Sequence, residues 1–296
     1  ALVLNSTDET VSLVDTASHT ETGRLSLCKE PHHLLATPDD TSVVVACAVS
    51  NELVFLDPRT GREQRRVRDI SDPYQLGFSP DRKWLVTNSL RLDRVDLYNA
   101  NDLTIVARIP APKTPSHMAF DRASQYVFVT LQGSSEVLAI NLKTQQPEWK
   151  IPVGPTPAGI HMTPDDKYLL VAIMGADYLE VIDWRTHTSV KKVTIDKATH
   201  NFLPRGDGRH VFVSGRTRAG SISLFDTITL EVVEKYDVPG GPDDMEIRAD
   251  GQELWATARF ARRVQVVDLA RKRLAYSIPV GRSPHGVYFA DHAPRK

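Results

Sequence analysis

Histidine is concentrated at two neighbouring positions of a repeated segment, just after a proline or threonine. Pro31-His32-His33 and Pro284-His285 are examples. The fourteen positions of these two columns would hold about half of one histidine if the ten in the chain were spread evenly. They hold five, namely His32, His33, His117, His200 and His285. Neutral imidazoles that converge from separate strands suit copper or another transition metal, or an axial contact to a tetrapyrrole.

The other residues of the two columns are polar or small and differ between copies. The position that follows is apolar in every copy, from Leu34 to Val287, and is therefore assigned to the core. An alternative is that proline followed by histidine is simply how this repeat begins a strand, with each imidazole bonding nearby backbone groups. Five column residues could contact a ligand or orient ligating rings: Tyr74, Gln75, Asn201, Asp243 and Asp244.

Arginine is concentrated in three loops, 88–94, 214–221 and 257–263. Because strands alternate in direction, we expect these loops on the same face as the histidine columns. A guanidinium matches carboxylate or phosphate through its planar fork, so a small anionic ligand is one candidate. Single-stranded nucleic acid is another, with Phe260 available to stack on a base, and ordinary solvated loop charge is the alternative to both. The arginines are Arg91, Arg94, Arg216, Arg218, Arg259, Arg262 and Arg263.

The elements that must position these residues form a regular repeat. A strand ending in Asp or Asn recurs every 42 or 43 residues, at Asp15, Asp57, Asn99, Asn141, Asp183, Asp226 and Asp268. Alternating apolar residues and Pro-Asp or Asp-Gly turns predict four antiparallel strands per copy. Seven such copies predict an all-β, seven-bladed β-propeller as a single domain over residues 1–296. The recurring acidic residues are interpreted as turn formers and not as catalysts.

Ring closure is also predicted from the order of the strands. The chain opens on a second strand, ALVLNS, and ends on a first strand at residues 284–289. The C-terminal strand should therefore complete the blade that three N-terminal strands begin, which removes two exposed edges.

The motifs PDRKWLVTN (80–88) and PDDKYLLVA (164–172), with PVG or PGG links before first strands, resemble the YVTN-repeat β-propellers of bacterial periplasmic, secreted and surface-layer proteins. The resemblance covers the entire chain. It implies the propeller fold and a periplasmic or secreted location. The architecture is also similar to the haem d1 domain of cytochrome cd1 nitrite reductase, which implies a haem d1-like tetrapyrrole as a candidate cofactor beside a transition metal.

Composition limits the remaining possibilities. Lysine plus arginine (36) nearly cancels aspartate plus glutamate (37), so nucleic acid would need a local basic surface. No apolar run approaches the roughly 20 residues of a membrane span. A start at Ala1 without methionine fits removal of a secretory signal peptide, with a trimmed chain as the alternative. The two cysteines, Cys28 and Cys47, are expected to be free thiols.

Three functions follow from these observations. The leading one is a non-enzymatic propeller that binds a ligand or protein partner at a His/Arg-rich channel mouth. The second is a metal- or haem-dependent oxidoreductase, or a cofactor-assembly factor, that uses the histidines. The third is single-stranded nucleic-acid binding. The chain contains no GxSxG, CxxC, HExxH or CxxCH motif that would favour a different chemistry.

Overall fold

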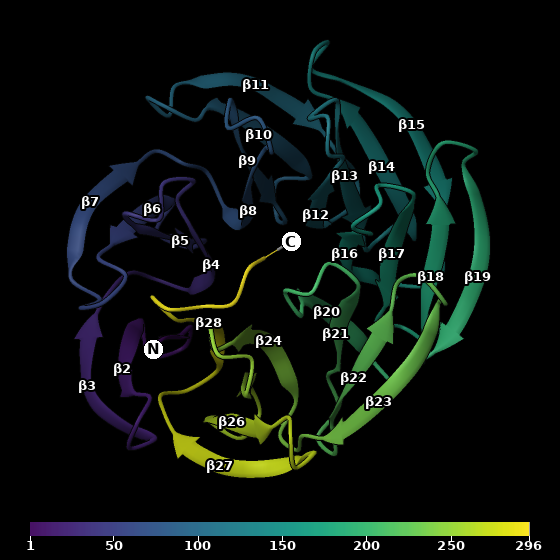
Figure 1. Cartoon of the computed structure of the whole chain (residues 1–296). Coiled ribbons are helices and arrows are strands. Elements are labelled where there is room, and N and C mark those ends of the chain that lie inside the picture. Colours follow the sequence, from purple (N-terminus) through teal and green to yellow (C-terminus); the bar gives the residue numbers. More distant parts are fainter. Residues whose placement is uncertain (296) are drawn as a thin grey trace. The chain divides into compact units, whose positions relative to one another are not determined.

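The computed structural model describes residues 1–295, and all regular elements in this range are β-strands. They form seven four-stranded antiparallel sheets, one per repeat, so the predicted seven-bladed β-propeller is confirmed (Figure 1). Contacts divide the chain into two compact units. The first unit contains residues 1–70 and 201–296, and the second contains residues 71–200.

Four blades belong to the first unit, although β20 starts with two residues of the second. Their strands are given in order from first to fourth. One blade contains β28 (Pro284–Tyr288), β1 (Leu2–Asn5), β2 (Thr10–Asp15) and β3 (Thr20–Ser26), and the next contains β4 (Pro31–Ala36), β5 (Val43–Cys47), β6 (Glu52–Leu56) and β7 (Glu63–Arg68). A third contains β20 (Thr199–Pro204), β21 (His210–Gly215), β22 (Ser221–Asp226) and β23 (Glu231–Asp237), and a fourth contains β24 (Pro242–Ile247), β25 (Glu253–Ala258), β26 (Arg263–Asp268) and β27 (Arg273–Pro279).

Three blades belong to the second unit. The first of them contains β8 (Pro73–Phe78), β9 (Trp84–Ser89), β10 (Arg94–Asn99) and β11 (Ile105–Pro110). The second contains β12 (Pro115–Phe120), β13 (Tyr126–Leu131), β14 (Glu136–Asn141) and β15 (Gln146–Pro152). The third contains β16 (Pro157–Met162), β17 (Tyr168–Ile173), β18 (Tyr178–Asp183) and β19 (Thr188–Thr194).

The chain ends close one sheet. β28 pairs antiparallel with β1, with Val287 opposite Val3 and Tyr288 opposite Leu2. The strand order β28-β1-β2-β3 confirms the predicted combination of three N-terminal strands and one C-terminal strand. This pairing matters for function because it carries His285, near the end of the chain, into the first unit.

The hydrophobic core lies between facing sheets. In the first unit one buried cluster joins Phe212 and Leu224 of one blade to Met245 and Leu254 of the next. Second and third strands are buried almost throughout, whereas fourth strands alternate between exposed and half-buried residues, as in β3 and β23. Branched side chains on both faces of the inner strands therefore provide most of the apolar burial.

The repeated Asp or Asn after each third strand is a turn residue, as predicted. Its side-chain oxygen accepts hydrogen bonds from backbone amides two or three residues later in all seven blades, for example from Arg59 and Thr60 to Asp57. These Asx turns hold the link between the third and fourth strands.

Cys28 and Cys47 form a disulfide, with 5.9 Å between their Cα atoms. The sequence-based expectation of free thiols is therefore wrong. The two cysteines are separated by 19 residues, but the hairpin of β4 and β5 places Pro31 opposite Cys47. That register brings Cys28, three residues before the strand, next to the end of β5.

Candidate functional site

Each first strand begins in distorted backbone. The residue before it has a left-handed conformation in all seven blades, with φ between 47° and 77°. Pairing with the second strand then shifts register, for example between Pro31 and Leu34 and between Pro242 and Met245. Such a bulge sets two residues against one and redirects their side chains. The two adjacent column positions are therefore both turned inward: His32 is 2% exposed and His33 is 5% exposed.

Three of the five column histidines meet in the first unit. The ring centroids of His32 and His285 are 3.8 Å apart, those of His33 and His285 are 4.5 Å apart, and those of His32 and His33 are 4.8 Å apart. One nitrogen from each ring lies within 4.8 Å of the others. β4 carries two of the rings and β28 the third. We call His32, His33 and His285 the histidine trio.

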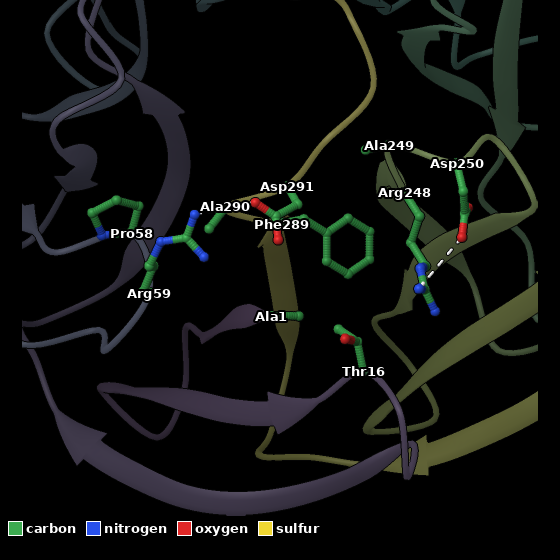
Figure 2. Close-up of a pocket in the computed structure, with 10 residues that line it drawn as sticks. All are labelled: Ala1, Thr16, Pro58, Arg59, Arg248, Ala249, Asp250, Phe289, Ala290 and Asp291. Atoms are coloured by element: carbon green, nitrogen blue, oxygen red, sulfur yellow. Dashed lines mark hydrogen bonds and ion pairs between the residues drawn. The ribbon is translucent and has the colours of Figure 1, made fainter.

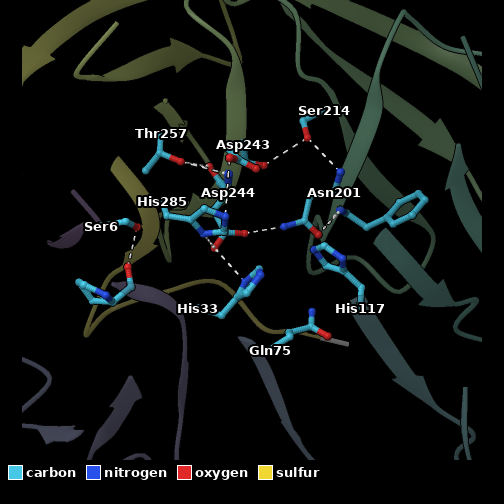
Figure 3. A network of polar contacts seen from close by, with 12 residues as sticks. Ser6, His33, Gln75, His117, Asn201, Ser214, Asp243, Asp244, Thr257 and His285 are labelled. Atoms are coloured by element: carbon cyan, nitrogen blue, oxygen red, sulfur yellow. Dashed lines mark hydrogen bonds and ion pairs between the residues drawn. The ribbon is translucent and has the colours of Figure 1, made fainter. Parts of the chain in front are cut away.

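Two carboxylates from β24 lie beside His33 and His285 of the trio (Figure 3). Asp244 Oδ2 lies 3.8 Å from Nδ1 of His33 and 3.8 Å from Nδ1 of His285. Asp243 Oδ2 lies 3.6 Å from Nε2 of His285. The other oxygen of Asp244, Oδ1, accepts a 2.6 Å hydrogen bond from Asn201 Nδ2. His285 therefore has one carboxylate beside each of its ring nitrogens.

Asp243 is held by two of the predicted arginines. Its Oδ2 lies 3.3 Å from Arg216 Nη1 and 3.2 Å from Arg259 Nη1, and its side chain is fully buried. Arg259 also donates from Nε to Ser283 Oγ at 3.1 Å. The two loops 214–221 and 257–263 thus each direct one arginine inward, and each guanidinium contacts the same carboxylate oxygen through its Nη1.

Burial sets the protonation of two members of the site. Burial, and then the positive forms of His285 and His33, hold the pKa of His32 well below its ordinary value. A neutral imidazole is the form that binds a metal. Burial, followed by Asp243 and Glu246, raises the pKa of Asp244 well above its ordinary value, although 20% of its side chain remains accessible.

Hydroxyl residues on the second strands support the columns, and the sequence analysis missed them. Thr257 Oγ1 accepts the amide hydrogen of Asp244 and donates to its carbonyl oxygen. Ser214 Oγ accepts the amide hydrogen of Asn201 in its own blade and donates to the carbonyl oxygen of Asp243 in the next blade. The available signal was a Ser or Thr at the penultimate position of β21 and β25, which aligning the second strands would have found.

The remaining predicted column residues lie in the second unit. His117 and His200 approach edge to face, with 5.5 Å between ring centroids, and Tyr74 lies 6.0 Å from His117. Ser116 Oγ is 2.7 Å from His117 Nδ1, and Gln75 Oε1 accepts the amide hydrogen of Met118 at 2.6 Å. His117 is thus approached by one other column histidine, a hydroxyl and an aromatic ring, whereas the trio brings three imidazoles together.

The other predicted arginines have separate roles. Arg91 pairs with Asp72 at 2.8 Å and Arg94 with the buried Asp96 at 2.8 Å, both in the second unit. Arg218 lies over the ring of Phe260 at 5.8 Å. The side chain of Arg263 donates to the backbone carbonyl of Ser277. The backbone carbonyl of Arg262 accepts from the amide of Val280.

Two concave features of the first unit differ in whether they reach the trio. A cavity of about 350 Å³ is lined by Arg59, Arg248 and Phe289, but its arginines are paired with Asp291 and Asp250 (Figure 2). A shallower depression of about 310 Å³ is lined by Ser6, Lys29, Ser283 and Arg259, among others. Only the second reaches the site, because Arg259 borders the depression and contacts Asp243.

Comparison with known families decides the classification. The YNCE-like beta-propeller family matches the chain over residues 1–295. The chain belongs to the YNCE-like beta-propeller family. The predicted resemblance to repeat propellers is thereby confirmed.

Individual relatives of this YNCE-like propeller are distant. Protein NirF of Pseudomonas aeruginosa is 20% identical, with 99% of this chain and 91% of NirF covered. Antigen Lp49 of Leptospira interrogans is 22% identical over 75% of this chain, which spans only 44% of that protein. The chain thus matches less than half the length of Lp49 but most of NirF.

Solved structures support the fold. Hydrazine synthase of Kuenenia stuttgartiensis matches with a TM-score of 0.73 at 18% identity, covering 86% of this chain and 88% of that one. Dihydro-heme d1 dehydrogenase NirN in complex with DHE matches with a TM-score of 0.69 at 19% identity, covering 93% and 62%. At these identities the likeness shows the propeller fold alone. Separately, none of the elements in residues 1–295 is a helix long and apolar enough to cross a membrane.

Proposed function

We propose that this YNCE-like propeller is a non-enzymatic binding protein whose ligand is a transition-metal ion held by His32, His33 and His285. The observation that carries the proposal is the convergence of three imidazole nitrogens within 4.8 Å of one another. Imidazole is a preferred ligand of zinc, copper, iron and nickel. The rings come from two strands distant in sequence, so only the folded chain assembles the site.

An oxidising compartment fits this proposal. Cys28 and Cys47 are paired, and disulfides persist chiefly in secreted and periplasmic proteins. We therefore propose a periplasmic or secreted protein. The small anionic ligand predicted from the arginine loops stays a prediction, because Glu9 and Glu30 line the depression beside Arg259 and Lys29, and Arg259 is paired with Asp243.

A haem d1-like tetrapyrrole is the second candidate. It is favoured by the likeness to NirN, whose structure is described as a complex with DHE, and by the match to NirF. The trio itself fits this group poorly. Axial ligation needs one imidazole facing an open, flat space, whereas these three rings pack within 4.8 Å of each other and are at most 5% exposed.

Metal binding to the purified protein tests the proposal. After chelator treatment, we expect one equivalent of Zn²⁺, Cu²⁺ or Co²⁺ per chain in a calorimetric titration. His33→Ala and His285→Ala should each weaken binding by at least about 100-fold, more than loss of a group that merely supports a ligand. His187→Ala, at an exposed histidine of β18–β19, is the control and should bind like the unaltered protein.

Three results would count against the metal. Failure of the unaltered protein to bind any of the three ions would overturn the proposal. Equal loss in His187→Ala would show nonspecific surface binding. A stoichiometric haem spectrum in a protein that binds no free metal ion would favour the tetrapyrrole.

A further inference from the structure

The neighbouring acids Asp243 and Asp244 have different surroundings. Asp243 Oδ2 is contacted by two guanidinium groups, at 3.2 and 3.3 Å. Asp244 is contacted by the amide of Asn201 and approached by two imidazoles. Asp243 is thus already paired with two positively charged groups. Arg295 also acts on Asp244, but its guanidinium pairs with Glu246. A cation held by the trio would add positive charge beside Asp244 Oδ2.

The position of Asp244 suits direct coordination. Tetrahedral zinc with bonds of about 2.0–2.1 Å places its ligand atoms roughly 3.3 Å from one another. Asp244 Oδ2 is 3.8 Å from Nδ1 of both His33 and His285. These two distances exceed the spacing by about 0.5 Å, and the imidazole nitrogens of the trio lie within 4.8 Å of one another, so binding requires the ligands to close by up to about 1.5 Å around one ion.

The rest of Asp244 is fixed in a way that leaves Oδ2 pointing at the rings. Asn201 Nδ2 holds Oδ1 at 2.6 Å. Thr257 bonds the backbone amide and carbonyl of Asp244 at 3.0 and 3.2 Å. A carboxylate held at one oxygen and at its backbone loses little freedom when the other oxygen binds a metal.

Asp243 suits a different task. It lies on the Nε2 side of His285, at 3.6 Å, whereas Asp244 lies on the Nδ1 side. A metal-bound imidazole usually donates its second N–H to a carboxylate, which fixes the ring and its tautomer. Asp243 can accept this hydrogen bond, while Arg216 and Arg259 hold the Asp243 carboxylate in place.

We propose that Asp244 is the fourth ligand of the metal, through Oδ2, and that Asp243 is the positioning residue that fixes His285 with Nδ1 toward the ion. This inference rests on the metal-binding function proposed above. A set of three imidazole nitrogens and one carboxylate oxygen, without thiolate, selects a divalent ion such as Zn²⁺, Co²⁺ or Cu²⁺ over Cu⁺.

The ligand field of Co²⁺ separates the two roles. We expect Asp244→Ala to weaken Zn²⁺ binding at least about 100-fold and to change the position and intensity of the Co²⁺ visible bands. Asp243→Asn should weaken binding by about 10–100-fold but leave the band shape unchanged, because it removes only a partner of His285. Asp291→Asn is the matched control, because its side chain is 75% exposed and pairs with Arg59 outside the site.

A second variant distinguishes loss of a metal ligand from loss of the fold. Asp244→His replaces one ligand type with another, so it should retain one bound Co²⁺ while shifting its bands. Thermal unfolding of each metal-free variant shows whether the fold is kept. If Asp244→Ala binds Zn²⁺ within twofold of the unaltered protein, with the same Co²⁺ spectrum, Asp244 is not a ligand. That result leaves the proposed function intact, whereas a protein that binds no metal at all removes both.

Discussion

At the residue scale, the chemistry of a side chain here depends on which atoms border it more than on its type. Asp226 illustrates this away from the site. Its Oδ1 accepts the amides of Ile228 and Thr229 as a turn former, while its Oδ2 accepts from the Arg209 guanidinium. The Arg209 hydrogen bond holds the pKa of Asp226 below its ordinary value, despite the opposing effect of burial.

Asp226→Asn should lower the free energy of unfolding at pH 7 by about 1 kcal/mol, because it keeps the turn but removes a charge-assisted pair. The folded-state pKa of Asp226 lies below the unfolded-state value near 3.8. The stabilisation is therefore complete above that pH and is lost as pH falls through the folded-state pKa. Urea unfolding at pH 7 and pH 3 should show the difference between variant and unaltered protein shrinking in acid.

Asp268→Asn provides the comparison at the same repeat position. Its partner Arg271 is 71% exposed, so we expect a change within about 0.5 kcal/mol. An Asp226→Asn effect that is equally large at pH 3 and pH 7 would contradict a charge-based origin.

At the element scale, the hairpin of β4 and β5 links stability to the site. Its disulfide lies next to Pro31, and Pro31 precedes two members of the trio. Ser6 Oγ also donates to the Pro31 carbonyl at 2.6 Å. The start of β4 is thus fixed by a covalent bond and a hydrogen bond before its histidines turn inward.

Replacing both Cys28 and Cys47 with serine should lower the free energy of unfolding by about 2–4 kcal/mol, the usual contribution of a disulfide closing a loop of this size. We also expect weaker Zn²⁺ binding, because the backbone that presents His32 and His33 becomes freer. Urea unfolding and calorimetric titration measure the two effects. Addition of a reductant should lower the stability and the Zn²⁺ affinity of the unaltered protein in the same way, and should change neither quantity in the double variant. An unchanged Zn²⁺ affinity would show that the disulfide does not support the site.

At the scale of the whole molecule, the pairing of β28 with β1 serves both fold and site. It gives β1 a partner at what would otherwise be an open edge, and it supplies His285. Ligand binding and global unfolding should therefore be coupled, since the trio exists only in the folded state.

Saturating Zn²⁺ should raise the thermal midpoint. At a free concentration of 100 times Kd, a ligand specific for the folded state adds about 2.7 kcal/mol, which corresponds to about 4 °C for a chain of this size. Differential scanning calorimetry with Zn²⁺ and then with excess chelator measures the shift and its reversal. His285→Ala should show no shift, and a shift of equal size in that variant would place the stabilising ion elsewhere.

The seven blades, their strand order, the closing strand and the turn role of the repeated Asp or Asn could all be predicted from the amino-acid sequence. These depend on local alternation and turn chemistry, which recur every 42 or 43 residues and so are visible without coordinates. It also singled out the histidine columns, because a position that varies beside one that is always apolar is visible in the repeat alignment.

Which of the column residues meet could not be predicted from the sequence, because it depends on how the strands pair and pack in the folded chain. Bulges at the start of β4, β24 and β28 turn adjacent residues to the same side, which strict alternation along a strand does not predict. They join His32, His33 and His285 and give Asp243 and Asp244 different partners. In the second unit, His117 of β12 lies beside His200 of β20. The disulfide could not be predicted for the same reason. The register across a hairpin depends on how two strands pair, and neither the residue types nor their spacing in the sequence specifies that register.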